Sequence, residues 1–201
     1  DLLHVILPAD IAAELKATGE VRPRKVENVA ILFADVAGFT SYCDSREPET
    51  IHHDLQDLVK QMEILTAAYG MEKIKTIGDA YLAAAGLLKR TPDPALDCVR
   101  CGLAMMEMAK TLPSAWELRV GVHCGAVVAG IVGRQKYQYD VWGDTVNAAA
   151  RMQTEANPSS LCVSAETWRR LESQCEGRSL GLREIKGKGE VEVFEVLAVR
   201  T

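Results

Sequence analysis

Short apolar runs alternate with longer amphipathic segments along the chain. Residues 29–34 form a continuous apolar run that ends at Asp35, which predicts a buried strand. In residues 49–69 the apolar side chains recur at steps of three and four, and Gly70 follows, which predicts a helix that ends there. The same spacing predicts a second helix over residues 94–111.

Several strands are predicted as hairpins. Residues 73–77 and 80–84 are two strand-like runs joined tightly at Gly78-Asp79. A second hairpin is predicted over residues 118–132, with its turn at Cys124-Gly125. Further strands are expected over residues 137–141, 161–164 and 191–198, and further helices from about residue 144 and over residues 165–174.

The order of these elements predicts an α+β fold with a mostly antiparallel sheet. The chain has 201 residues, enough for one sizeable core. Residues 2–18 predict a short amphipathic helix broken at Pro8, and residues 19–28 a polar connection to the first strand.

The net charge of -5 argues against a nucleic-acid partner, which would need a basic face. No apolar run reaches the roughly 18 residues of a membrane span. Because the chain starts at Asp1, we expect it to be a piece of a longer protein. The six cysteines lack the pattern of a small secreted domain, so we expect reduced thiols and a cytoplasmic catalytic domain, although the parent chain could be membrane-anchored.

Cys98 and Cys101 form a C-x2-C pair that has two interpretations. One is half of a zinc site. The other is two cysteines one turn apart on the helix of residues 94–111, and it is favoured because no second Cys or His pair follows.

Asp35 and Asp79 each lie where an apolar segment meets solvent. If their strands are neighbours, the two carboxylates converge and provide the oxygen ligands that Mg2+ prefers. Asp79 alone has a simpler interpretation as a turn residue after Gly78. Gly38, just past the first strand, indicates a loop whose backbone N–H groups are available to a phosphate. A single glycine is weak evidence for such a loop.

Two further polar groups have open interpretations. Asn147 and Arg151 are four residues apart on a predicted helix, so they share a face that could grip ribose and phosphate or could merely be solvated. Lys186 and Lys188 lie in a predicted turn that could contact phosphate or be a plain surface turn. The phosphate-binding motif of P-loop NTPases and the dinucleotide motif are both absent from the sequence.

Five segments together resemble the catalytic domain of class III adenylyl and guanylyl cyclases, in the family's order and approximate spacing. They are residues 33–40, 73–81, 118–125, 139–152 and 185–189. The resemblance spans residue 29 to about residue 197 and implies a ferredoxin-like βαββαβ core with additional strands and helices, related to polymerase palm domains. It also implies a homodimer with active sites shared between the two subunits.

The resemblance assigns a role to each candidate residue. Asp35 and Asp79 match the family's two metal-binding aspartates, which hold two Mg2+ or Mn2+ ions per site. Phosphate contacts on the same subunit are expected from Gly38, Phe39, Thr40 and Arg119. The other subunit would supply a base-reading pair, matched by Lys75 and Asp140. Asn147 matches the residue that orients the ribose, and Arg151 matches the arginine that stabilises the transition state. Lys186 matches a lysine that contacts the triphosphate.

The base-reading pair favours ATP, because a lysine only donates and an ionised aspartate only accepts. Guanylyl members of the family carry Glu and Cys where this chain has Lys75 and Asp140, so the resemblance implies an adenylate cyclase that makes cyclic AMP and pyrophosphate. A guanylyl or dual-specificity cyclase, a silent nucleotide-binding module and a plain dimerisation module are the alternatives. Residues 1–25 resemble the connector of sensor-linked cyclases, which leaves residues 26–201 as the catalytic domain and an upstream sensor domain as the expected partner.

Overall fold

The computed structural model describes residues 6–133, 137–185 and 187–200. The elements are α2 (Ala9–Thr18), β1 (Arg24–Val36), α3 (Phe39–Asp44), α4 (Pro48–Ala68), β2 (Glu72–Ile77), β3 (Ala80–Ala85), α5 (Pro94–Thr111), β4 (Leu118–Val132), β5 (Gln138–Trp142), α6 (Asp144–Glu155), β6 (Ser160–Ser164), α7 (Ala165–Leu171), β7 (Cys175–Ile185) and β8 (Gly189–Val199).

The strands form one sheet in the order β2-β3-β1-β4-β6-β8-β7, and β5 pairs with β4 beside this path. The first part of the chain, β1-α4-β2-β3-α5-β4, is the predicted βαββαβ core, and its strands pair antiparallel in the order β2-β3-β1-β4. The predicted α+β class and ferredoxin-like core are therefore confirmed. Among the described strands, the pairing of β4 with β6 is parallel.

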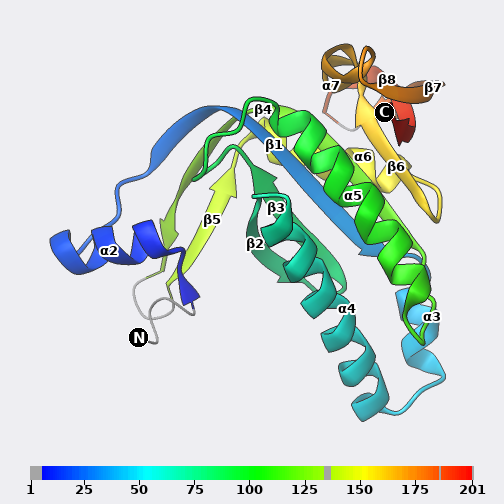
Figure 1. Ribbon diagram of the computed structural model, residues 1–201, viewed down its shortest axis with the longest axis horizontal. Helices are drawn as coiled ribbons and strands as arrows, with labels where there is room; N and C mark the ends of the chain where they lie inside the picture. The colour runs from blue at the N-terminus through cyan, green and yellow to red at the C-terminus, as the bar shows by residue number, and fades with distance from the viewer. Residues whose placement is uncertain (1–5, 134–136, 186, 201) are drawn as a thin grey trace.

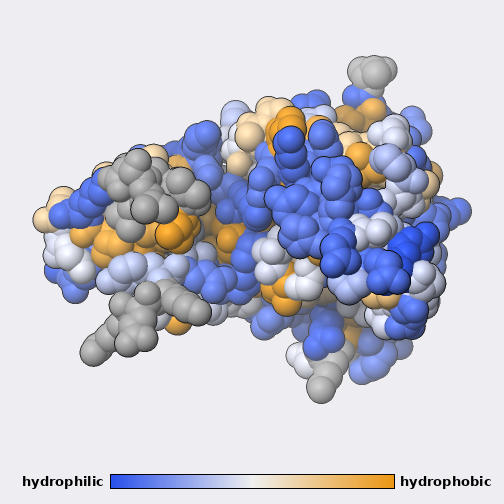
Figure 2. Space-filling view, turned by 90° about the horizontal axis from the view of Figure 1, so that it is seen from below, coloured by the Kyte–Doolittle hydropathy of each residue, from blue (hydrophilic) through white to orange (hydrophobic). Residues whose placement is uncertain are grey.

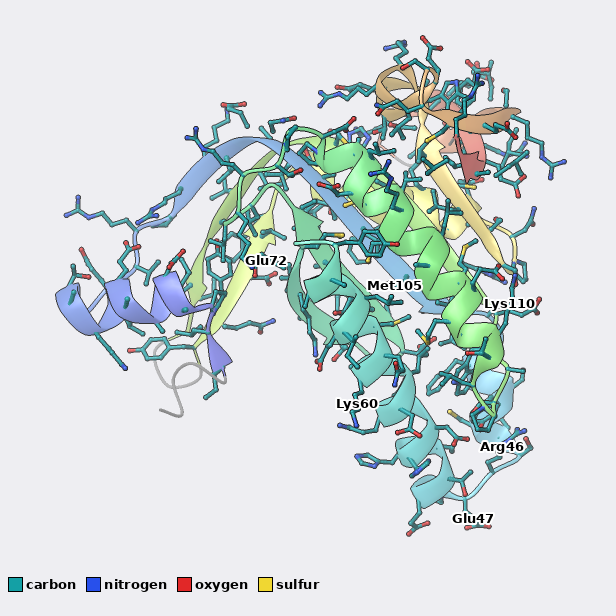
Figure 3. The ribbon with its side chains drawn as sticks, in the orientation of Figure 1. Arg46, Glu47, Lys60, Glu72, Met105 and Lys110 are labelled. Carbon is teal, nitrogen blue, oxygen red and sulfur yellow. The ribbon has the colours of Figure 1, made fainter. Side chains whose placement is uncertain are left out.

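Two helices, α4 and α5, lie on one face of this sheet (Figure 1). The largest hydrophobic cluster joins them to alternate side chains of β1 and β4. Met105 of α5 is fully buried there, whereas Lys60 of α4 is on the solvent side (Figure 3). Helix α6 lies on the opposite face of β4, because a Cβ at Gly121 would meet the α6 backbone at 2.0 Å.

Helix α2 begins directly after Pro8, where the sequence predicts the break. Leu7, Ile11 and Ala12 are buried in a second cluster, which also contains Val29 of β1. Family resemblance places a domain boundary at residue 25, and that boundary stays a prediction. Across the described residues, no helix is both long and apolar enough to span a membrane.

The predicted hairpin over residues 118–132 is wrong, because these residues form the single strand β4. Both halves of β4 pair with the same partner, from Leu118 opposite Val36 to Ala129 opposite Arg24. Gly125 therefore serves close packing and not a turn: a Cβ there would meet the Thr145 hydroxyl of α6 at 2.5 Å.

Two further differences concern the last third of the chain. Helix α7 ends at Leu171 and is shorter than predicted, and β7 follows it without having been predicted.

Cys98 and Cys101 are both buried on α5, and all six cysteines have free thiols.

Candidate active site

Asp35 and Asp79 lie next to each other at one end of the core strands. Asp35 is the last residue but one of β1, and Asp79 lies in the turn between β2 and β3. Because Ala34 of β1 pairs with Tyr81 of β3, the turn lies beside the end of β1. The conformation of Gly78, with φ of 62°, makes this tight turn possible. The predicted convergence of the two carboxylates is confirmed.

Because the two carboxylates are neighbours, ionisation of both at once is unfavourable. Burial, the hydrogen bond with Asp79 and the charge of Asp79 raise the pKa of Asp35 from 3.8 to about 6, while Arg119 lowers it. A divalent cation between the two oxygens would remove this repulsion. The donor set fits Mg2+ or Mn2+, since such ions commonly use one or two carboxylates together with waters and substrate phosphates.

Arg119 lies directly opposite Asp35 in the pairing of β4 with β1. Its Nε atom is buried, and no atom of the described residues accepts a hydrogen bond from it. An unpaired buried guanidinium N–H costs free energy, so this group suits an anionic oxygen that arrives with a ligand. The predicted phosphate contact therefore has a physical basis beside the aspartates.

Gly38, Phe39 and Thr40 form the start of α3, directly after β1. The first hydrogen bond of this turn runs from Tyr42 N–H to the Gly38 carbonyl, so the N–H groups before it have no acceptor within the helix. The Phe39 ring packs against the Trp116 ring, with 6.0 Å between the ring centroids. Phe39 thus anchors the loop, and only its backbone is available for phosphate.

Lys75 of β2 and Asp140 of β5 form an ion pair at 2.5 Å. The second carboxylate oxygen of Asp140 accepts a hydrogen bond from the Val141 N–H at 2.9 Å. The predicted base-reading pair is therefore assembled within one chain. Lys75 also lines a pocket of about 730 Å³ between the start of the described chain, the end of α4, β2 and β5.

Asn147 and Arg151 are both exposed on one face of α6, as their spacing predicts. With Asp144 and Lys188 they line a cavity of about 340 Å³. Lys188, in the turn before β8, forms an ion pair with Asp144 at 2.6 Å. The adjacent Lys186 lies outside the described residues, so its predicted triphosphate contact stays a prediction.

Gln153 is a site residue that the sequence did not indicate. Its side-chain Nε2 donates a hydrogen bond to Oδ2 of Asp35 at 3.3 Å. Gln153 follows Arg151 by two residues on α6, where it looks like any polar residue of an amphipathic helix. Only the packing of α6 across β4 brings it to the end of β1.

Seven of the predicted residues thus fall into three groups on one chain. The carboxylate group contains Asp35, Asp79 and Arg119; the base group contains Lys75 and Asp140; the helix group contains Asn147 and Arg151. Among the residues that the structure describes, no hydrogen bond or ion pair joins one group to another.

Comparison with known proteins identifies the origin of this arrangement. The family model for the adenylate and guanylate cyclase catalytic domain matches residues 21–198. An adenylate cyclase of Mycobacterium tuberculosis is 34% identical over 201 residues, which cover 98% of this chain and 45% of that protein. Retinal guanylyl cyclase 2 of Homo sapiens is also 34% identical, over 203 residues, which cover 96% of this chain and 18% of that protein. The chain spans less than half the length of these curated relatives.

Solved structures show the same fold. The catalytic core of a rhodopsin-guanylyl cyclase with converted specificity, in complex with ATPαS, superposes with a TM-score of 0.85 at 30% identity, covering 88% of this chain and 98% of that chain. The guanylate cyclase domain from Catenaria anguillulae, in complex with GTP, gives 0.85 at 29% identity, covering 88% of this chain and 100% of that chain. With the family match over nearly its whole length, this chain belongs to the adenylate and guanylate cyclase catalytic-domain family.

Proposed function

We propose that this domain is an adenylate cyclase, which converts ATP to 3′,5′-cyclic AMP and pyrophosphate at sites shared by two copies of the chain. The observation that carries the specificity is the Lys75–Asp140 pair. Adenine offers an acceptor at N1 and an amino donor at N6, which complement one donor and one acceptor side by side. Guanine presents N1–H and O6, the reverse polarity, so both side chains would face a like group.

Relatives of both kinds match this chain to a similar extent, so overall similarity does not separate ATP from GTP. The polarity of Lys75 and Asp140 supports ATP. Leaving two polar groups unpaired costs about 1–3 kcal/mol each, enough for a clear preference. The second candidate function, a guanylyl or dual-specificity cyclase, rests on the guanylyl relatives and on the GTP complex of a similar structure.

The proposed reaction is internal to the nucleotide. The ribose 3′-oxygen bonds to the α-phosphorus, the bond from that phosphorus to the bridging oxygen breaks, the 3′-hydroxyl loses its proton, and pyrophosphate leaves. Because both reacting groups belong to one molecule, fixing their orientation lowers much of the barrier. Two divalent ions held by Asp35 and Asp79 would favour the ionised 3′-oxygen and neutralise the triphosphate.

The chain's own groups supply the remaining charge and orientation. Arg119 and the N–H groups of residues 38–40 bind phosphate oxygens next to the aspartates. Asn147 orients the ribose, and Arg151 binds the charge that builds on the α-phosphate. Arg151 is suited to this because its planar guanidinium stays charged and donates to two oxygens at once.

A dimer brings the three groups together. Among the described residues, no hydrogen bond or ion pair joins the base group or the helix group to the carboxylate group, which supports a site that a second copy completes. Large apolar side chains are exposed close to the base group: Ile77 at 53%, Val132 at 56% and Tyr137 at 40%. Figure 2 shows a hydrophobic area toward the α2 side of an otherwise mostly hydrophilic face. Exposed apolar patches of this kind favour protein–protein contact.

The test is incubation of the purified domain with ATP or GTP and Mg2+ or Mn2+, followed by quantification of cyclic nucleotide and pyrophosphate. Cyclic AMP from ATP, absent with Asp35→Ala, supports the proposal. Preferential cyclic GTP supports the guanylyl alternative. Metal-dependent nucleotide binding without pyrophosphate release, at concentrations that enforce dimers, would instead indicate a silent nucleotide-binding module.

A further inference from the structure

Gln153 connects two of the three groups physically. Its amide donates to the carboxylate of Asp35, and its backbone belongs to α6, which carries Asn147 and Arg151. A helix turns about 100° per residue, so Gln153 lies about 200° around the helix axis from Arg151. One face of α6 is therefore directed to the carboxylates of its own chain, and the opposite face is exposed.

The position of Gln153 is fixed by close backbone packing. A Cβ on Gly121 of β4 would meet the Gln153 backbone nitrogen at 2.0 Å and its Cα at 2.6 Å. Phe33 of β1 pairs with Gly121, two residues before Asp35. The side chain of Gln153 thus extends from a backbone that touches the sheet and spans from β4 to Asp35. It is half-buried, which limits competition from water for this hydrogen bond.

We propose that Gln153 is a positioning residue, whose amide holds Asp35 in the orientation that binds the divalent ion. This inference rests on the proposed function, which makes Asp35 a metal ligand. An amide suits the role because its NH₂ group donates to one carboxylate oxygen and leaves the other oxygen of Asp35 for the ion. Such outer-shell partners of metal ligands commonly affect metal affinity by about 10- to 100-fold.

The first experiment measures metal affinity without turnover. Mn2+ binding is followed by electron paramagnetic resonance in the presence of 3′-deoxy-ATP, which lacks the attacking hydroxyl. Gln153→Met keeps the length of the side chain and removes the donor, so we expect roughly tenfold weaker Mn2+ binding. The control is Thr154→Ala, at the next, exposed position, whose hydroxyl donates a hydrogen bond to the Ala150 carbonyl at 3.1 Å; it should bind Mn2+ like the parent.

The second experiment separates positioning of Asp35 from support of α6. One copy carries Asp35→Ala and the other carries Arg151→Ala, so that a mixed dimer holds a single intact site. Gln153→Met in the copy that supplies Asp35 should lower activity roughly tenfold at subsaturating Mn2+, with kcat at saturating Mn2+ affected less. In the copy that supplies Arg151 the same change should have no effect.

The outcomes are distinct. Unchanged Mn2+ affinity, or equal losses with Gln153→Met in either copy, would overturn the positioning role. Failure of the two parent copies to complement each other, before Gln153 is changed, contradicts the shared site of the proposed function instead. The Mn2+ measurement then still decides whether Gln153 positions Asp35.

Discussion

The ammonium group of Lys75 donates a hydrogen bond to Asp140 across 65 residues of sequence. The exposed fractions of the two side chains are 27% and 12%, so the pair is partly shielded from water. One oxygen of Asp140 accepts from Lys75 and the other from the Val141 N–H. Under the proposed function, a base that replaces this contact must offer one acceptor and one donor in the matching order, and the pair would select the nucleotide by this requirement.

Reversing the polarity of this pair should move the nucleotide preference. The double variant Lys75→Glu with Asp140→Cys should lower kcat/KM for ATP and raise the ratio of GTP to ATP turnover. Each mismatch is worth about 1–3 kcal/mol, which corresponds to roughly 5- to 150-fold per position. Initial rates with both nucleotides at equal metal concentration measure the ratio, and an unchanged preference contradicts the role of this pair.

Asp35→Asn should stabilise the metal-free protein at neutral pH. The pKa of Asp35 is raised from 3.8 to about 6, so the folded chain binds this proton more tightly than the unfolded chain. The stability gained from this tighter proton binding is fully present below about pH 4 and is lost as pH rises through about 6. The melting temperature of the variant, relative to the parent, should therefore rise between these pH values.

Melting curves recorded in EDTA over this pH range test the prediction. Added Mn2+ at pH 7.5 should raise the melting temperature of the parent and have little effect on Asp35→Asn, because the cation relieves the same repulsion. A relative stability that does not change with pH would show that Asp35 carries no such strain in the metal-free fold.

Arg151→Ala should reduce kcat by about 100-fold or more with little change in KM, because under the proposed function the guanidinium binds the charge that builds in the transition state. Arg151 is exposed, so the variant should unfold at the same temperature as the parent. Lys110→Ala, which removes a surface cation from the last turn of α5 (Figure 3) that pairs with Glu107, is the control and should keep full activity. A rise in KM with unchanged kcat would instead assign Arg151 to ground-state binding.

Gly121→Ala should destabilise the fold strongly. Its Cβ would lie 2.0–2.6 Å from backbone atoms of α6, which cannot move away as a flexible side chain can. Displacing α6 costs about 1–3 kcal/mol or more of unfolding free energy. Gly130→Ala on the same strand is the matched control, since its nearest neighbour would be 3.3 Å away. Urea unfolding of both variants measures the difference; equal stabilities would mean that α6 does not rest on Gly121.

The core of the fold could be predicted because its elements carry strong local signals. The α4 helix and the β2–β3 hairpin have clear periodicity and glycine at their ends, and both formed close to the predicted bounds. Gly125 misled the prediction because a glycine for a turn and a glycine for close packing look the same in a sequence. The strand β7 was missed because its mostly exposed residues lack an apolar run.

The candidate site also combines residues that the sequence predicts with one that it does not. Asp35 and Asp79 could be predicted to converge only on the condition that their strands are neighbours, because each follows an apolar segment; the pairing of β1 with β3 meets that condition. The pairing of Lys75 with Asp140 came from family resemblance, since nothing local relates β2 to β5. Gln153 could not be found, because its contact with Asp35 depends on how closely α6 packs on β4.

The separation of the three groups on one chain has a consequence for control. Under the proposed dimer, the domain responds to two inputs at once, the nucleotide and a correctly oriented neighbour. An attached element that changes the distance or the angle between two copies would then change the rate without touching any residue of the site. Input domains of unrelated construction could therefore drive the same catalytic module.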